Sequence, residues 1–225
     1  MAHMIKKTDA QIQEHVMNEL RWDTRVKGTD VGVEVDRGIV ALTGTVDSWA
    51  ARVAAQDAAH RVAGVLDVAN DIHVKLPSSL ERTDADIART IRAALEWDVL
   101  VPHDHILSTV SNGVVTLEGT VDYWAQHDDA GRAVRNLPGV KEVRNLIAVD
   151  PPVARVAPEI LRRAIDGALE RHAAHAASHV QIEVRDGKVV LMGRVPSWPE
   201  RNAVVGAVRG TPGVRTVDDR IHVGV

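Results

Sequence analysis

Gly38-Ile-Val-Ala-Leu-Thr-Gly-Thr-Val-Asp-Ser-Trp49 returns as Gly113-Val-Val-Thr-Leu-Glu-Gly-Thr-Val-Asp-Tyr-Trp124 and again as Gly187-Lys-Val-Val-Leu-Met-Gly-Arg-Val-Pro-Ser-Trp198. The copies start 75 and then 74 residues apart, and no gap interrupts the motif within a copy. Solenoid repeats are usually shorter than about 50 residues, so this period indicates tandem small domains. The expected domains are 8–74, 83–149 and 157–223, and the expected linkers are 75–82 and 150–156.

Each copy carries the signals of an αββαβ order. Apolar residues four positions apart, such as Ile12, Val16 and Leu20, predict an amphipathic first helix. Two alternating apolar stretches follow, and the glycine turn between them predicts a β-hairpin, because glycine accepts a positive φ. A second helix and a last strand complete the copy. We therefore predict an α+β fold of three tandem domains, each a three-stranded mixed sheet with two helices packed on one face.

Local signals add detail to this fold. The inward glycine of the second strand, as at Gly119 and Gly193, predicts close approach of a helix or of neighbouring backbone. Thr8 and Thr83 are expected N-caps of the first helices, whereas the third copy places Pro158 at the first helical position. Ser197-Trp-Pro-Glu200 has the form of a capping box at the start of a second helix.

Composition limits the classes of function. The chain has 225 residues, a net charge of −4 and no cysteine, so neither disulfides nor thiolate metal sites are expected. A nucleic-acid binder normally carries a clear basic excess, which argues against nucleic acid as a partner. No apolar run is long enough for a transmembrane helix. The N-terminal residues lack the apolar core of a signal peptide, which favours the cytoplasm, the alternative being the periplasm if a leader has been removed.

The combined pattern resembles the BON domain family. The residues that carry the resemblance are the αββαβ signals, the Gly-x-Val-x-Leu-x-Gly-x-Val core, and a late Gly-Val-x-x-Val followed by Asn or Asp, as in Gly139–Asn145. The likeness covers nearly the whole chain, and the three copies resemble cytoplasmic relatives of osmotically induced members. It implies a non-enzymatic, stress-associated protein that binds phospholipid or envelope surfaces, acts as a chaperone or, in one branch, senses potassium.

The tryptophans at the start of the second helix are the first binding candidates. Trp49, Trp124 and Trp198 occupy the same position in every copy. Because a helix N-terminus attracts anions and Trp favours the membrane–water boundary, these side chains predict an interfacial wedge on anionic lipid. The alternative is that each indole closes the rim of a small core that contains no Phe.

The third copy differs from the other two in charge. The first two copies carry net charges of −5 and −4, and the third carries +2. The residues predicted to hold an anionic headgroup or acidic partner are Trp198, Arg194, Arg201, Arg209 and Arg215. The alternative is a solvated basic face. Arg171 also replaces Trp22 and Trp97, which end the first helix of the other copies.

Three histidines in the third copy form a candidate metal site. If the first helix continued through them, His172, His175 and His179 would share one side, a geometry open to zinc or nickel. His179 aligns with Asp30 and His105, at the start of the first strand, so we expect the helix to end before it. The alternative is a set of surface histidines at a helix end.

Two functional hypotheses follow from these features. The first is a non-enzymatic protein of osmotic or envelope stress, an adaptor or holdase-like protein that meets anionic phospholipid or client protein surfaces through its second helices. The alternative is a small-ligand or potassium-ion sensor that uses the relative orientation of its three domains, and no other cofactor is expected. No enzyme is predicted, since the sequence has no Gly-x-Ser-x-Gly elbow, phosphate loop or dinucleotide fingerprint.

Overall fold

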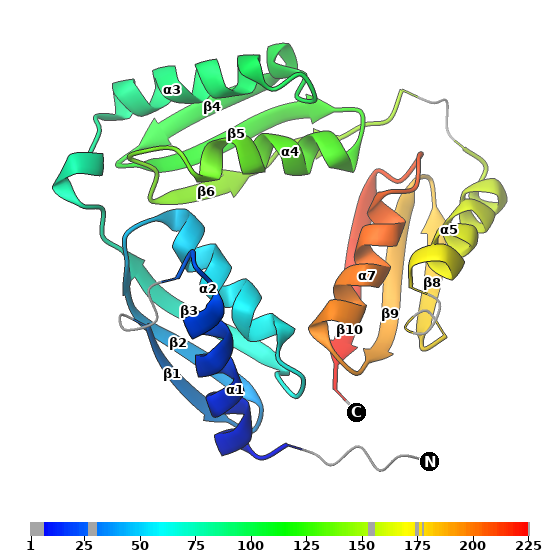
Figure 1. Cartoon of the computed structure of the whole chain (residues 1–225). Coiled ribbons are helices and arrows are strands. Elements are labelled where there is room, and N and C mark those ends of the chain that lie inside the picture. The colour runs from blue at the N-terminus through cyan, green and yellow to red at the C-terminus, as the bar shows by residue number, and fades with distance from the viewer. Residues whose placement is uncertain (1–6, 27–30, 153–155, 174–175, 177, 225) are drawn as a thin grey trace.

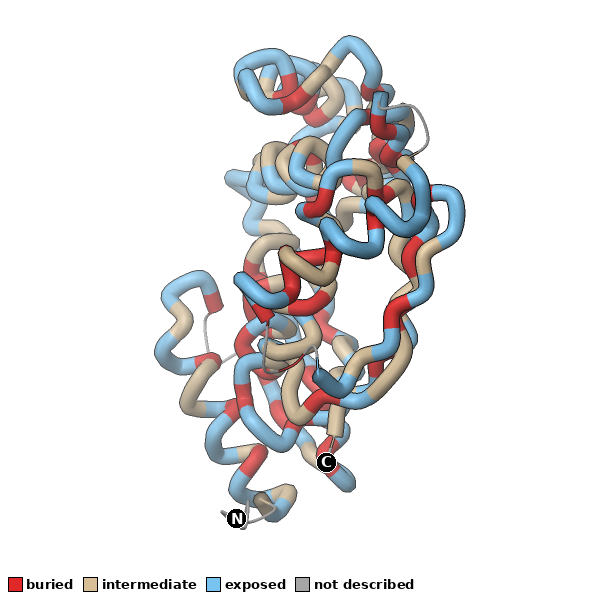
Figure 2. The backbone as a smooth tube through the Cα atoms, turned by 90° about the vertical axis from the view of Figure 1, so that its right-hand side faces the viewer, coloured by how far each residue is buried: buried red, intermediate tan, exposed pale blue. Residues whose placement is uncertain are grey.

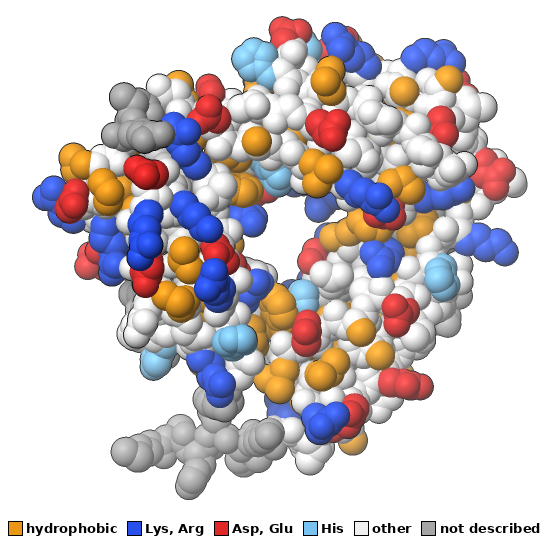
Figure 3. All heavy atoms as spheres, turned by 180° about the vertical axis from the view of Figure 1, so that it is seen from behind, with side chains coloured by type: hydrophobic (Ala, Val, Ile, Leu, Met, Phe, Trp, Pro, Cys, Tyr) orange, Lys and Arg blue, Asp and Glu red, His pale blue; other side chains and the backbone are white. Residues whose placement is uncertain are grey.

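Three small domains follow one another around a triangle in the computed structural model (Figure 1). The structure describes residues 7–26, 31–152, 156–173, 176 and 178–224. Seen from behind as spheres, the molecule has an opening between the three domains (Figure 3). The end of the chain returns to the first domain, so the arrangement is a closed ring rather than an open string (Figure 1).

The helices and strands appear in the predicted order. Domain 1 consists of α1 (Asp9–Trp22), β1 (Val31–Asp36), β2 (Ile39–Val46), α2 (Trp49–Arg61) and β3 (Asp67–Val74). Domain 2 consists of α3 (Asp84–Trp97), β4 (Ile106–Ser111), β5 (Val114–Val121), α4 (Trp124–Arg135), β6 (Glu142–Asn145) and β7 (Ala148–Val149), with a short 3-10 helix at His103–His105. Another short 3-10 helix, Ser78–Leu80, lies in the linker before it. Domain 3 consists of α5 (Pro158–His172), β8 (Val180–Arg185), β9 (Lys188–Val195), α7 (Trp198–Arg209) and β10 (Thr216–Val223).

Each domain is built on a mixed sheet, which confirms the predicted fold class. In domain 1, β2 lies in the middle, antiparallel to β1 and parallel to β3, and the other domains repeat this order. The alternation along β2 points Val40 and Leu42 into the core. There they are completely buried, as are Val16 of α1 and Ala58 of α2. Each domain has its own core, so buried positions are distributed along the whole molecule (Figure 2).

The hairpin turn and the first helix are fastened together. Arg37 and Gly38 have φ values of 50° and 80°, as a type I′ turn requires. Their backbone N–H groups donate to the two carboxylate oxygens of Asp9, at 2.8 and 2.9 Å. Asp84 makes the same pair of bonds to the turn of domain 2. The first-turn aspartate therefore holds the start of the helix against the hairpin.

The glycines of the central strands are required by neighbouring backbone, as predicted. Gly119 and Gly193 have φ values of 134° and 144°, a region that other residues rarely adopt. A Cβ at either position would collide with the carbonyl oxygen of His105 or His179, just before the adjacent strand. The central strand can therefore approach its antiparallel partner only with glycine at this position.

Helix starts also follow the predictions, with one exception. Thr8 and Thr83 each accept a hydrogen bond from the backbone N–H three residues on, and Pro158 begins α5. At α7, Ser197 accepts from the backbone N–H of Glu200 at 3.4 Å. The reciprocal bond is not found among the described residues, where one oxygen of Glu200 is buried and unpartnered. The predicted capping box is therefore only half formed.

Candidate functional site

The second-helix tryptophans lie where the domains meet. Each is the first residue of its helix, and each is half-buried. Trp49 of domain 1 packs against the core of domain 2, Trp124 against the cores of domains 2 and 3, and Trp198 of domain 3 against the core of domain 1. One indole thus occupies each junction, and the three contacts form a cycle.

The junction of domains 3 and 1 is the most specific of the three. The Trp198 indole stacks on the His60 imidazole with ring centroids 3.9 Å apart and planes 18° apart. Its Nε1 donates to the carbonyl oxygen of Leu66 at 3.2 Å. Arg201 of the same helix lies over the indole, 4.6 Å from the ring centroid. Burial lowers the pKa of His60; Asp57 and Asp67 oppose this shift and Arg201 reinforces it.

The other two junctions are built differently. Arg209 of domain 3 lies over the ring of Trp124 of domain 2 at 4.5 Å, a cation–π contact between domains. The Trp124 Nε1 atom is buried and has no hydrogen-bond partner among the described residues. At the junction of domains 1 and 2, Trp49 is covered by Arg52 of its own domain, at 5.1 Å. Within the described part of the chain, an interdomain indole hydrogen bond is found only at Trp198.

The four arginines predicted to bind anions in domain 3 do not gather into one patch. Arg201 and Arg215 each form an ion pair at 2.6 Å with a carboxylate, Asp219 and Asp150 respectively. Arg209 lies against domain 2, and Arg194 is exposed on β9. Arg201 is the one that lies over Trp198, and it is already neutralised by its ion pair.

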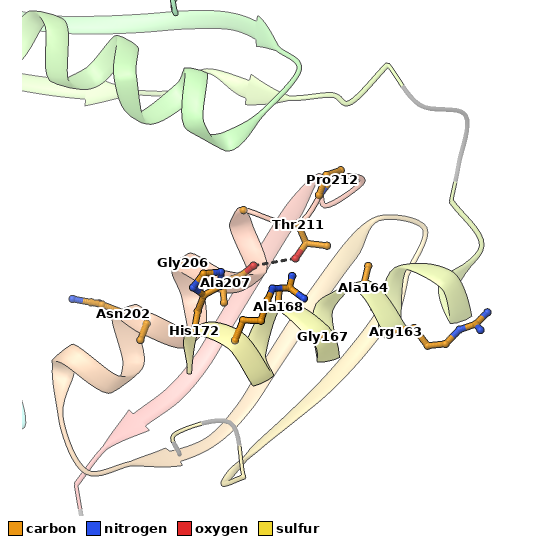
Figure 4. A pocket seen from close by; sticks show the side chains of 13 residues that line it. Arg163, Ala164, Gly167, Ala168, His172, Asn202, Gly206, Ala207, Thr211 and Pro212 are labelled. Carbon is orange, nitrogen blue, oxygen red and sulfur yellow. Dashed lines mark hydrogen bonds between the residues drawn. The ribbon is translucent and has the colours of Figure 1, made fainter. Parts of the chain in front are cut away.

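A groove of about 610 Å³ runs between the two helices of domain 3 (Figure 4). Its floor consists of small residues of α5 and of α7 and its end, among them Gly167, Ala168 and Gly206. Arg163 and Arg171 lie on its rim. The groove therefore combines an apolar floor with cationic edges, a combination that suits an amphipathic anion.

In domain 1 an ion-pair clamp bridges the corresponding helices. Arg61 at the end of α2 donates to Glu19 of α1 at 3.0 Å and to Asp23 at 3.3 Å. The Asp23 side chain is only 5% exposed, and hydrogen bonding from Arg25, followed by that from Arg61, holds its pKa well below the ordinary value against the opposing effect of burial. The residues of domain 3 at the positions of Arg61, Glu19 and Asp23 are Gly210, Ala168 and His172. Domain 3 therefore cannot form this clamp beside its groove.

The three candidate metal-binding histidines are not presented by one helix. α5 ends at His172, and His179 immediately precedes β8, as the alignment predicted. His175 lies outside the described residues. Among the residues that are described, no three His, Cys, Asp or Glu side chains are grouped closely enough to hold a metal ion.

Two other tryptophans form an apolar feature that the sequence analysis did not select. Trp22 and Trp97 end α1 and α3, and they are 84% and 86% exposed. In domain 2 the adjoining loop adds Val99, 95% exposed, and Leu100. We call Trp22 and Trp97, with Val99 and Leu100, the apolar tips. The sequence carries one sign that these two tryptophans are exposed. Domain 3 has Arg171 at the same position, so the core does not need an aromatic residue there.

Fold and site together define a class: tandem small α+β domains whose distinctive features are interdomain contacts, apolar tips and a helical groove. The chain belongs to the BON domain family, whose model matches residues 8–75, 83–151 and 159–225. No helix in the described part of the chain is long and apolar enough to cross a membrane.

Comparison with known proteins gives relatives with similar sequences. The chain is 36% identical over 141 residues to the osmotically-inducible protein Y of Escherichia coli, covering 61% of this chain and 70% of that protein. It is also 36% identical over 112 residues to an uncharacterized protein of Anaplasma centrale, covering 48% and 74%. Among solved structures, CdsD, a structural protein of the type III secretion system of Chlamydia trachomatis, aligns over 92% of this chain and 90% of its own, with 13% identity and a TM-score of 0.26.

Proposed function

We propose that this protein is a non-enzymatic osmotic-stress protein that acts as a holdase, covering apolar segments of client proteins with its apolar tips. The relation to the osmotically-inducible protein Y supports the link to osmotic stress. The observation that carries the holdase role is the exposure of Trp22 and Trp97 at equivalent ends of domains 1 and 2. Soluble proteins rarely leave clustered large apolar side chains in water without a partner.

Charge favours a protein client over an anionic lipid at the tips. Domains 1 and 2, which carry them, have net charges of −5 and −4. Such domains are repelled by an anionic membrane, whereas acidic surfaces around an apolar tip keep a complex with an unfolded client in solution. Each indole offers roughly 150–250 Å² of surface to bury, enough for weak, reversible capture.

The test is suppression of aggregation of a heat-denatured client. We expect Trp22→Ser combined with Trp97→Ser to lose most of the suppression, and Arg171→Trp, which supplies a third tip, to increase it. Arg194→Ala is the matched control, because it changes another exposed side chain away from the tips. A double variant that keeps native circular dichroism and full suppression contradicts the holdase proposal.

The groove of domain 3 favours a second candidate function, binding of anionic phospholipid. It lacks the clamp of domain 1 and has Arg163 and Arg171 on its rim. Co-sedimentation with vesicles that contain phosphatidylglycerol, compared with vesicles of phosphatidylcholine alone, tests this proposal. We expect binding only to the former, and its loss in Arg163→Glu combined with Arg171→Glu. Equal sedimentation of this variant and the native chain excludes the groove.

Potassium sensing remains an alternative proposal, supported only by the division of the chain into three domains that could reorient. Titration with potassium or sodium, followed by small-angle scattering and Trp fluorescence, tests it. A profile unchanged by either ion excludes the sensor. A cytoplasmic location is likewise a proposal, which fractionation of producing cells tests.

A further inference from the structure

The junction of domains 3 and 1 joins two preformed faces. We call Trp198 and Arg201 the clasp, and His60 with the Leu66 carbonyl the socket. The clasp is held within domain 3, because Ser197 caps the helix that begins at Trp198 and Arg201 is ion-paired at 2.6 Å. Neither restraint comes from domain 1, so the clasp is shaped before the junction forms.

The socket is equally independent of domain 3. The backbone N–H of Leu66 donates to the carbonyl oxygen of Gly38 at 2.8 Å, which fastens this segment to the hairpin turn. His60 lies in the last turn of α2, one residue before the Arg61 clamp to α1. The stacking surface and the acceptor that the indole needs are therefore fixed by domain 1 alone.

This junction also differs from the other two in connectivity. Residues 75–82 lead from domain 1 into domain 2, and residues 150–156 lead from domain 2 into domain 3. No linker bridges domains 3 and 1, which meet only through contacts. α2 and α7 also contact each other across this junction. Gly224, beyond the last strand, lies near Leu66, since a Cβ at this glycine would be 3.3 Å from the Leu66 Cδ2 atom.

We propose that the socket is a self-docking site: it holds the clasp of its own chain in the closed ring, and it accepts the clasp of a second copy when the internal contact is released. Opening exposes the half-buried indole, its N–H and the Leu66 carbonyl to water, and the same face on another chain restores the stacking and the hydrogen bond. Tethering favours the internal contact, since domain 2 and its two short linkers keep the clasp near the socket, with an effective concentration on the order of millimolar. Exchange between chains therefore requires that the internal contact be lost.

The first experiment measures opening in the full-length chain. We expect Trp198→Ala and, from the other side, His60→Ala to increase the radius of gyration in small-angle scattering and to lower energy transfer between labels on domains 1 and 3. Trp198→Phe, which keeps stacking but loses the N–H donor, is expected to open less. Trp22→Ala is the matched control, since it removes an exposed indole away from the junctions. Circular dichroism and thermal melts verify that each variant remains folded.

The second experiment tests recognition between copies. Trp198→Ala leaves a free socket, and His60→Ala with Leu66→Asp leaves a free clasp. We expect each variant alone to be monomeric and open, and an equimolar mixture to form a one-to-one complex in light scattering. Native chain mixed with either variant is expected to stay monomeric. The proposal is overturned if Trp198→Ala scatters like the native chain, or if the mixture does not associate at the highest concentration that the chains tolerate.

Discussion

Domains 1 and 3 share the same backbone fold but differ in the side chains that lie between their two helices. In domain 1, Arg61 ties the end of α2 to Glu19 and Asp23. In domain 3, small residues and a histidine stand at the same positions, and a groove with a cationic rim is left open. The two domains thus keep the same strand alternation and glycines, while the residues between their helices differ in charge and size.

The largest loss of stability is expected from substitutions in the core, where the two domains are alike. Leu42 and Leu191 occupy the centre of β2 and β9 and are completely buried. Replacing either by Ala is expected to cost about 2–5 kcal/mol, because the cavity left in so small a core cannot collapse fully. Denaturant unfolding should give similar losses for both variants. Markedly unequal losses would mean that the two cores are not equivalent.

Breaking the clamp should destabilise domain 1. Asp23→Asn is expected to cost about 1–2 kcal/mol, since it weakens the ion pairs of the buried Asp23 with both Arg25 and Arg61, whose side chains are half-exposed. Because folding lowers the pKa of Asp23, its contribution is present above the unfolded value near 4 and is lost as the pH falls below it. Acid titrations of the native chain and the variant measure this difference.

A surface ion pair in domain 3 is the control for the clamp. Arg162 and Asp166 pair along α5, with both side chains about half-exposed. Asp166→Asn is expected to change stability by about 0.5 kcal/mol or less. An effect as large as that of Asp23→Asn would show that the clamp of domain 1 has no special role.

Acid should also weaken the ring closure. Folding lowers the pKa of His60, so above its unfolded value of 6.5 the imidazole is neutral in both states and contributes no pH dependence. Below that value the unfolded imidazole binds the proton more readily. Because the Trp198 indole covers His60 only in the closed ring, we expect closure to lose stability until the folded pKa is passed. We expect the change in scattering and Trp fluorescence to disappear in His60→Gln. A native chain whose dimensions are constant between pH 7 and 5 would contradict this expectation.

A small gain in stability, rather than a loss, is expected within the groove. A Cβ at Gly206 would meet no atom within 4 Å, so Gly206→Ala should stabilise domain 3 by about 0.5–1 kcal/mol through helix propensity. Gly131 of domain 2 is the matched control, because a Cβ there would lie 3.1 Å from the Asn145 amide. Gly131→Ala should gain less in thermal melts. If both variants gain the same stability, the open space at Gly206 does not explain the gain.

Much of each domain could be predicted because its causes are local. Positive φ at Gly38 and the stripe through Ile12, Val16 and Leu20 depend on neighbours along the chain, and both appeared where expected. The Glu200 half of the capping box failed, because the cap pattern does not determine where that carboxylate turns. The groove was not predicted either. Small residues on one helix leave a groove only where the neighbouring helix does not fill the space, and the sequence does not show how the two helices pack.

The sequence by itself determined three repeats, their element order and the equivalence of Trp49, Trp124 and Trp198, because periodic patterns and turn residues act within one domain. It did not determine what these indoles contact: the structure places each on a neighbouring domain and leaves Trp22 and Trp97 in solvent. Only the tertiary arrangement could decide this. An indole at a helix end gains similar burial against its own core or another one, and the choice depends on where the linkers allow the domains to meet.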